Sequence, residues 1–472
     1  MSSEKKQTVS LVNEHQKPWI TILLLAGPIF CEHILASLSQ AVDTAMVGSL
    51  GAIATASVSI SSAPNMLINS VVMALGVGFT SLIARSVGAN ELERARTLIR
   101  QAILTVTVLC IPVTLLLFGL ARLIPMWMGG AEEILDTAAT YNRIFALSTV
   151  FRCLTMILSS IHRGYGDSKT PMKVNISVNL LNVVGNFLMI FPTRTLSILG
   201  FEFTMFGFGW GVAGAAISTS LAATIGSLFL LIHCFTVKGE MRISIRDSFA
   251  PDKEELRSVV QLGIPAALQQ FAMSSSFIIV TSTVATLGTV AVASQSLAGT
   301  AESLSFMPGF AFATAVTTLF GQSLGAKRPD LAQKYLFHAI KLGSIVMLAT
   351  SFALFFGSTF IMGLFTPDPE VILHGSVLLK ILAVIQIPQM ISFCTNGALQ
   401  GAGDTKTPLY ISLISVWGVR VLGCIIFVRL LGFGLYTVCI CMCTDNVVRC
   451  ILGLIAYKRG KWKNIKLHQE NA

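Results

Sequence analysis

The stretch Gly164-Tyr165-Gly166-Asp167-Ser168-Lys169-Thr170-Pro171 returns, 237 residues later, as Gly401-Ala402-Gly403-Asp404-Thr405-Lys406-Thr407-Pro408. Three further landmarks keep the same offset: Pro28 and Pro265, Gly51 and Gly288, Gly88-Ala89 and Gly325-Ala326. Between Gly51 and Pro171 the two copies align without a gap. The chain is therefore a duplicated unit, and the nature of that unit decides the fold.

The composition of the unit is that of a membrane protein. Of 472 residues, 53% are hydrophobic and 12% are charged, whereas about 25% are charged in an average soluble domain. Long, mainly apolar runs reach the ~20 residues that cross a bilayer as a helix; they include 102–121, 174–191, 211–233, 343–365 and 408–428. Only helices and closed barrels satisfy their backbone in hydrocarbon, and these runs are too long for barrel strands. We expect an all-α polytopic membrane protein.

The apolar pattern predicts twelve transmembrane helices, six in each repeat. Their expected spans are 19–47, 52–84, 97–121, 134–160, 171–192, 209–236, 256–285, 289–323, 332–361, 371–399, 408–430 and 434–457. Proline interrupts several of them and predicts kinks at Pro28, Pro64, Pro112, Pro265, Pro308 and Pro388.

An even number of helices makes both repeats enter and leave on the same side of the membrane. The repeats are then parallel and related by an axis along the membrane normal, with a substrate cavity between two lobes. The expected organisation is an N-terminal tail (1–18), an N-terminal lobe (19–237), a linker (238–255), a C-terminal lobe (256–457) and a C-terminal tail (458–472).

Charge predicts the orientation. Lys and Arg collect in the tails, in the linker and in the loops on their side, Arg94 and Arg163 among them, and such an excess marks the cytoplasmic side. Both termini are therefore expected in the cytoplasm, in a multi-pass protein of the plasma (inner) membrane. The same rule accounts for the net charge of +10 without nucleic acid. The first 17 residues show no signal-peptide pattern, and the ten cysteines fit apolar packing.

Polar residues inside the predicted helices nominate a coupling site, because ionisable groups at membrane depth are costly and usually functional. Asp43 supplies a carboxylate, Asn182 and Asn186 share one face of their helix, and Thr219 adds a hydroxyl. Such oxygen ligands suit a proton or Na⁺; no zinc or haem pattern occurs. Two alternatives remain open: Asp43 as a helix-end carboxylate near the headgroups, and the asparagines as interhelical hydrogen-bonding groups.

The second repeat does not reproduce these polar residues. Asp43, Asn182 and Asn186 correspond to Val280, Val419 and Gly423. We therefore expect ion coupling in the first lobe.

Other polar residues are candidates for the substrate cavity. Gln269 and Gln270 align with Glu32 and His33, and Glu302 aligns with Asn65. The candidate cavity residues are Glu32, Gln269, Gln270, Met273 and Glu302. Asp445 and Arg449 are four residues apart and are expected to form a structural pair.

Several motifs resemble the multidrug and toxic compound extrusion (MATE) transporters over essentially the whole chain. They are Val42-Asp43-Thr44-Ala45-Met46-Val47-Gly48, the twin Gly-x-Gly-Asp-Ser/Thr-Lys-Thr-Pro loops, Gly211-Val212-Ala213-Gly214-Ala215-Ala216, Gly321-Gln322-Ser323-Leu324-Gly325-Ala326 and Gly460-Lys461-Trp462. The resemblance implies a twelve-helix secondary exporter driven by inward H⁺ or Na⁺.

By that likeness Asp43 matches the family's titrating acid, and Asn182, Asn186 and Thr219 match groups that surround a cation in related proteins. The sequence departs from some members at Asn186, where they have Asp, and at Met273, where one sodium-coupled branch has Glu.

The expected function is multidrug efflux by antiport of H⁺ or Na⁺ against amphiphilic or cationic organic compounds. A flippase for a lipid-linked precursor is the alternative, and a membrane-embedded enzyme or a passive channel is more remote. No cofactor is expected, and no metal beyond Na⁺ at Asp43. The expected partners are small organic substrates and membrane lipids, without nucleic acid, and the chain is expected to function as a monomer.

Overall fold

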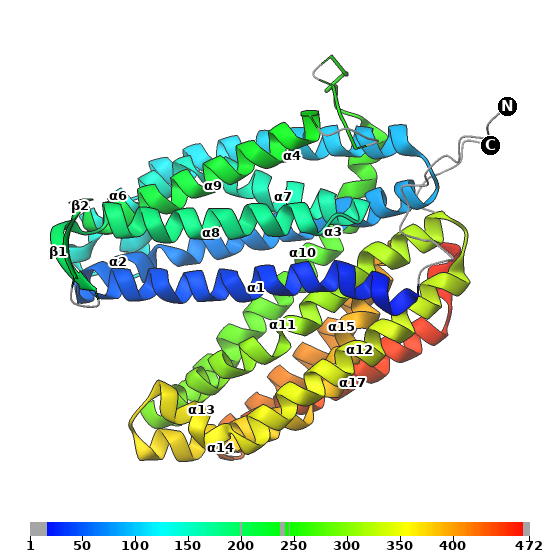
Figure 1. The fold of residues 1–472 in the computed structure, drawn as a ribbon. Coiled ribbons are helices and arrows are strands. Elements are labelled where there is room, and N and C mark those ends of the chain that lie inside the picture. The colour runs from blue at the N-terminus through cyan, green and yellow to red at the C-terminus, as the bar shows by residue number, and fades with distance from the viewer. Residues whose placement is uncertain (1–16, 199–200, 237–240, 245, 466–472) are drawn as a thin grey trace.

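Two helical lobes make up the protein (Figure 1). The computed structural model describes residues 17–198, 201–236, 241–244 and 246–465. Most of the predicted N-terminal tail (1–16), about half of the predicted C-terminal tail (466–472) and part of the segment that joins the lobes (237–240, 245) lie outside the described residues. The lobes converge at the end where α1 begins and α17 ends, and diverge toward the opposite end, which carries β1, β2, α13 and the start of α14. We call these the closed end and the hairpin end.

The first lobe contains the elements up to α9. In chain order they are α1 (Pro18–Gly48), α2 (Ala52–Ile60), α3 (Ser62–Gly88), α4 (Leu92–Gly119), α5 (Leu123–Trp127), α6 (Glu132–Leu147), α7 (Thr149–Tyr165), α8 (Lys169–Met189), β1 (Pro192–Ile198), β2 (Phe201–Phe208) and α9 (Gly211–Thr236).

The second lobe repeats this order without the strands. Its elements are α10 (Lys253–Ala285), α11 (Thr289–Gly325), α12 (Pro329–Phe356), α13 (Ser358–Phe365), α14 (Pro369–Val384), α15 (Gln386–Gly401), α16 (Lys406–Ser412), the π-helical segments η1 (Leu413–Val421) and η2 (Cys424–Leu430), α17 (Leu435–Lys458) and the short helix η3 (Lys461–Asn464).

Among the described residues, nine spans are long and apolar enough to cross a membrane, and two bent pairs, α6 with α7 and α14 with α15, raise the number to eleven. The twelfth is α8, whose four asparagines lower its hydropathy although its 21 residues suffice to span a bilayer. The predicted two-lobe, twelve-helix class is confirmed.

Some predicted helices are broken. The span expected at 134–160 bends by 48° between α6 and α7, and that at 371–399 bends by 53° between α14 and α15. Pro388 lies in the first turn of α15 and Pro64 in the first turn of α3, where a missing N–H costs least. Pro28, Pro112, Pro265 and Pro308 lie within unbroken helices.

A β-hairpin, which the sequence did not predict, joins α8 to α9. Its strands β1 and β2 are antiparallel, with Pro192 opposite Phe208 and Arg194 opposite Met205. Apolar residues alternate with Glu202 and Thr204 over 201–205, a period-two pattern typical of strands.

The backbone repeats its unusual conformations at the 237-residue offset. Gly166 and Gly403 have φ of 95° and 82°, and Asn90 and Lys327 have φ of 62° and 58°. Glycine favours such positive φ in a tight turn because it has no Cβ. The repeat in sequence is thus a repeat in conformation.

The lobes meet at a close helix crossing in the closed end. A Cβ on Gly88 of α3 would lie 2.0 Å from the carbonyl oxygen of Gln322 in α11, and a Cβ on Gly325 of α11 would lie 2.1 Å from that of Arg85 in α3. The two approaches are equivalent by the 237-residue offset. Only glycine permits this separation on both sides, so the crossing is built into both copies.

The first helix of each lobe also enters the hydrophobic core of the other lobe. Ile22 and Leu25 of α1 belong to a core cluster with residues of α11, α12 and α15. Their equivalents, Val259 and Leu262 of α10, belong to a cluster with residues of α3, α4 and α7. Each lobe is therefore anchored to its partner by half of one long helix.

Candidate functional site

The predicted coupling residues come together at the hairpin-end half of the first lobe. The Nδ2 of Asn186 in α8 donates to Asp43 in α1. One turn earlier, Asn182 Nδ2 donates to Thr219 Oγ1 in α9 at 2.9 Å, and Ser218 Oγ donates to the Asn182 carbonyl at 2.9 Å. Asn186 is fully buried. Three helices thus bring the four predicted residues into one polar centre, which we call the Asp43 centre.

Small residues allow this arrangement. A Cβ on Gly185 would lie 2.4 Å from Ser218 Oγ, so α8 and α9 approach closely. The spacing of four residues places Asn182 and Asn186 on one face of α8.

Sequence reasoning missed Tyr141 of α6, which interacts electrostatically with Asp43. Its ring stacks on Phe145 at 5.5 Å between centroids. Tyr141 is neither a carboxylate nor an amide, so the sequence criteria for a coupling site do not select it. No motif around it in α6 marks it as a functional residue.

Chemically the Asp43 centre offers oxygen ligands. It holds one carboxylate, two amide oxygens and one hydroxyl, and the buried Oδ1 of Asn186 has no hydrogen-bond partner among the described residues. Within the same residues no group of three or more His, Cys, Asp or Glu could hold a metal ion. An orphaned amide oxygen beside a carboxylate fits a proton carrier or a hard monovalent cation better than a transition metal.

Glu32 lies nearer the closed end of α1 and is engaged by two partners. Arg163 Nη2 lies 2.7 and 2.8 Å from its two carboxylate oxygens, and Asn175 Nδ2 donates to Oε1 at 2.8 Å. The equivalent pair of the second lobe is Gln269 and Ser412, joined at 3.0 Å. Both lobes therefore tie their first helix to the helix after the repeated motif.

The other predicted cavity residues do not form one cluster. Gln270 and Met273 are half-buried on α10, one and four residues from Gln269. Glu302 of α11 is buried and interacts electrostatically with Arg420. The expected pairing of Asp445 with Arg449 is present at 2.9 Å, and Arg420 joins the same carboxylate at 2.5 Å.

Polar contacts between the lobes gather at the closed end. Ser81 Oγ donates to the Gln400 carbonyl at 2.6 Å, and its equivalent Thr318 Oγ1 donates to the Arg163 carbonyl at 2.9 Å. Gln322 Nε2 donates to the Gly164 carbonyl at 3.1 Å. Each lobe thus accepts its partner's hydrogen bonds in the last turn of the helix that leads into the repeated motif.

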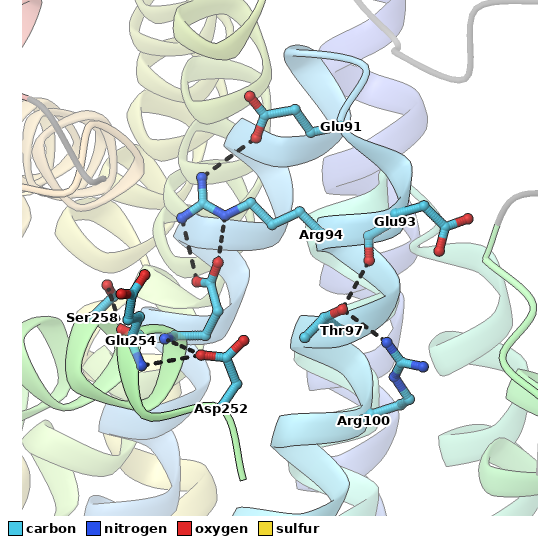
Figure 2. A network of polar contacts seen from close by, with 9 residues as sticks. Glu91, Glu93, Arg94, Thr97, Arg100, Asp252, Glu254 and Ser258 are labelled. Atoms are coloured by element: carbon cyan, nitrogen blue, oxygen red, sulfur yellow. Dashed lines mark hydrogen bonds and ion pairs between the residues drawn. The ribbon is translucent and has the colours of Figure 1, made fainter. Parts of the chain in front are cut away.

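A salt bridge extends this closure (Figure 2). Arg94 of α4 contacts Glu255 of α10 with Nε–Oε1 at 2.6 Å and Nη2–Oε2 at 3.3 Å. Asp252 caps α10 by accepting from the backbone N–H groups of Glu254 and Glu255 at 3.0 and 3.2 Å. Sequence reasoning assigned Arg94 to orientation alone and missed this bridge.

Comparison with known proteins agrees with this geometry. A family model described as MatE matches residues 28–188 and 265–426, two segments that begin 237 residues apart. The uncharacterized transporter YisQ of Bacillus subtilis is 27% identical over 97% of this chain and 98% of its own length. A probable multidrug resistance protein NorM of Thermotoga maritima is 28% identical over 94% of this chain and 92% of its own.

Solved structures share the fold. A MATE crystal structure in a straight conformation superposes with a TM-score of 0.86 at 24% identity, covering 95% of this chain and 96% of that one. An outward-facing multidrug resistance MATE transporter superposes with a TM-score of 0.85 at 24% identity and covers 98% of both chains.

Proposed function

The chain belongs to the MatE family of membrane transport proteins, and from this premise we propose that it exports amphiphilic or cationic organic compounds in exchange for H⁺ or Na⁺. It is a multi-pass membrane transporter and not an enzyme. The exchange, the coupling ion and the substrate class are the proposed part.

The observation that carries the proposal is the Asp43 centre. Its single carboxylate on α1 is held by α8, and the neighbouring oxygens offer ligands to a proton or Na⁺. Occupation by either cation removes the negative charge that Asn186 now stabilises. The proposal therefore assigns coupling to Asp43, with Asn182, Asn186 and Thr219 as supporting ligands and no further cofactor.

Alternating access follows from the position of α1. Its closed-end half packs in the core of the second lobe, while Asp43 is bonded to α8 of the first. A change of charge at Asp43 alters the contact between α1 and α8. Because α1 is also packed in the second lobe, this changes the preferred position of one lobe relative to the other. A cation shifts the equilibrium between the two arrangements of the lobes only by the difference in its binding free energy to each of them.

The substrate is proposed to bind between the lobes, where the candidate cavity residues Gln270, Met273 and Glu302 belong to the second lobe. Orientation rests on the basic loops of the closed end, which the positive-inside rule places in the cytoplasm. The present arrangement, with contacts gathered at the closed end, is then the one that faces outward. We propose the plasma membrane as its location and the single chain as the functional unit.

The test is efflux from proteoliposomes with H⁺ and Na⁺ gradients imposed separately, using ethidium as the probe. Asp43→Asn is expected to abolish gradient-driven efflux while the protein still folds, because the neutral amide mimics the occupied state. Glu370→Gln, an exposed carboxylate at the start of α14, is the matched control and should transport normally. Full efflux by Asp43→Asn would refute the assignment.

A further inference from the structure

The second lobe carries four charges at a level of the fold equivalent to the Asp43 centre. Arg420 lies one residue after Val419, the counterpart of Asn182, on the helix equivalent to α8. Asp445 and Arg449 lie on α17, which occupies the place of α9 in the second lobe. Both lobes thus have a polar centre at this level. In the first lobe its side chains are neutral apart from Asp43, whereas in the second lobe all of them are ionisable.

The core of this centre is one carboxylate shared by two guanidinium groups. Asp445 is fully buried, and its Oδ2 lies 2.5 Å from Arg420 Nη2 and 2.9 Å from Arg449 Nη2. A second contact joins Arg449 Nη2 to Oδ1 at 3.0 Å. The Nε atoms of both arginines are buried without a hydrogen-bond partner among the described residues. The three side chains together carry a net charge of +1.

Glu302 supplies the opposite charge. It is 7% exposed, and within the described residues no hydrogen bond or ion pair to its carboxylate is present. Two titratable or charged groups from neighbouring elements interact with it electrostatically, Arg420 of η1 and Cys439 of α17. The four-residue cluster is neutral only while Glu302 is ionised.

The helix that carries Arg420 departs from its counterpart at this place. The first-lobe helix α8 is a regular α-helix, whereas Leu413–Val421 is a π-helix. Such wide turns are rare and frequently occur at functional sites. The departure coincides with the replacement of Asn182 and Asn186 by Val419 and Gly423.

Arg449 of the cluster also lines a small cavity. A cavity of ≈ 20 Å³ reaches from Arg449 to Pro408 and Gly453 near the closed end and is lined by polar groups including Asn396 and Ser412. Such a volume suffices for about one water molecule. A buried carboxylate with no hydrogen-bond donor among the described residues, in the field of a charged cluster, is the arrangement of an exchangeable proton site in a membrane protein.

We propose that Glu302 is a second proton-exchange site, built into the C-terminal lobe and balanced by the Arg420–Asp445–Arg449 triad. The proposal rests on the proposed exchange function and deepens it. Glu302 gains one proton and becomes a neutral acid, and no other bond changes. The cluster then carries +1, a charge that an organic cation between the lobes would feel as repulsion. The two lobes would each exchange one proton through different chemistry.

Infrared difference spectra of the purified full chain, recorded between acidic and alkaline pH, test the proposal without knowledge of the substrate. We expect two carbonyl bands from buried protonated carboxyl groups in the unaltered protein. Glu302→Gln should remove one band and Asp43→Asn the other, and Glu302→Asp should keep both with one shifted. Glu370→Gln should leave both unchanged.

Proton release on addition of tetraphenylphosphonium gives the functional arm. Two protons per bound cation are expected, one in either single variant and none when Glu302→Gln and Asp43→Asn are combined. An unchanged infrared spectrum and an unchanged proton count in Glu302→Gln would overturn the proposal. If instead Asp43→Asn alone left both readouts unchanged, the assignment of Asp43 would fail while the second site stood. Asp445→Asn, which raises the triad to +2, should weaken proton binding at Glu302 without removing its band.

Discussion

Removing the charge of Glu255 should loosen the closed end of the molecule. Glu255 accepts both contacts of Arg94 across the lobes, and its side chain is 8% exposed while that of Arg94 is 22% exposed. Glu255→Gln keeps the size of the side chain and the cap that Asp252 provides, but it leaves the guanidinium facing a neutral amide. The contact exists only while α4 and α10 are together, so its loss destabilises the closed arrangement selectively.

The magnitude follows from the geometry. A hydrogen bond to a charged group contributes about 1.5–3 kcal/mol net, and full burial of the pair would raise the cost toward about 3–5 kcal/mol. Arg94 is partly exposed and keeps a second partner, Glu91, at 3.4 Å. We therefore expect a shift of about 2 kcal/mol, which is roughly 30-fold in the ratio of the two arrangements at 1.4 kcal/mol per factor of ten.

Hydrogen–deuterium exchange measured by mass spectrometry can read this shift. Backbone amides at the N-terminus of α10 and the C-terminal ends of α3 and α11 should exchange faster in Glu255→Gln by about that factor. Glu93→Gln is the matched control, because it makes the same change of side chain in α4 and Glu93 pairs with Arg96 within that helix at 2.5 Å. Equal exchange in the two variants would show that the bridge does not hold the closed end.

Two further predictions concern stability. Gly88→Ala places a Cβ 2.0 Å from the Gln322 carbonyl oxygen and should lower the thermal unfolding midpoint by several degrees. Gly27→Ala is the control, because a Cβ there meets nothing within 4 Å, and it should leave the midpoint unchanged. Equal midpoints in the two variants would refute the close crossing. Burial alone would raise the pKa of Asp167, but the imidazole of His162, whose Nδ1 lies 3.3 Å from Oδ2, and hydrogen bonds from Thr170 outweigh it and hold that pKa below its ordinary value. A carboxylate of this kind stabilises the fold above its unfolded-state pKa of about 4, and this contribution is lost as the pH falls through the folded-state pKa. Lowering the pH below 5 should therefore lower the thermal unfolding midpoint of the unaltered protein more than that of Asp167→Asn. Parallel curves of midpoint against pH would contradict this.

The sequence was sufficient for the architecture because duplication and hydropathy are both written along the chain. The motif at Gly164–Pro171 and its copy fixed the offset, and helix length against bilayer thickness fixed the number of spans. The proximity of the residues of the Asp43 centre was also predictable, since a carboxylate inside an apolar helix is costly and attracts attention, and the i,i+4 spacing of Asn182 and Asn186 places both amides on one face.

Contacts between distant segments were not predictable in the same way. Arg163 was expected only to mark the cytoplasmic side, yet its side chain lies 2.7 Å from Glu32 and its carbonyl receives Thr318. Arg94 was judged by the same rule and bridges the lobes. A charge near a helix end satisfies the positive-inside rule whether it faces water or a partner 161 residues away, so its role depends on tertiary packing that no local pattern encodes.

The helices α1 and α10 are anchored in the same way at one end but are attached differently at the other. Ile22 and Leu25 hold α1 in the core of the second lobe, and the equivalent residues hold α10 in the first, so the anchoring is symmetric. The attachment of the opposite halves is not: α1 depends on the charged contact between Asp43 and Asn186, whereas Val280, the counterpart of Asp43, is a buried apolar residue. If Asp43 binds the coupling ion as proposed, its occupation changes the free energy of the α1–α8 contact while the equivalent contact of α10 stays the same. A symmetric scaffold with a switchable contact in this one place would then convert a local change of charge into an asymmetric movement, as the proposed exchange requires.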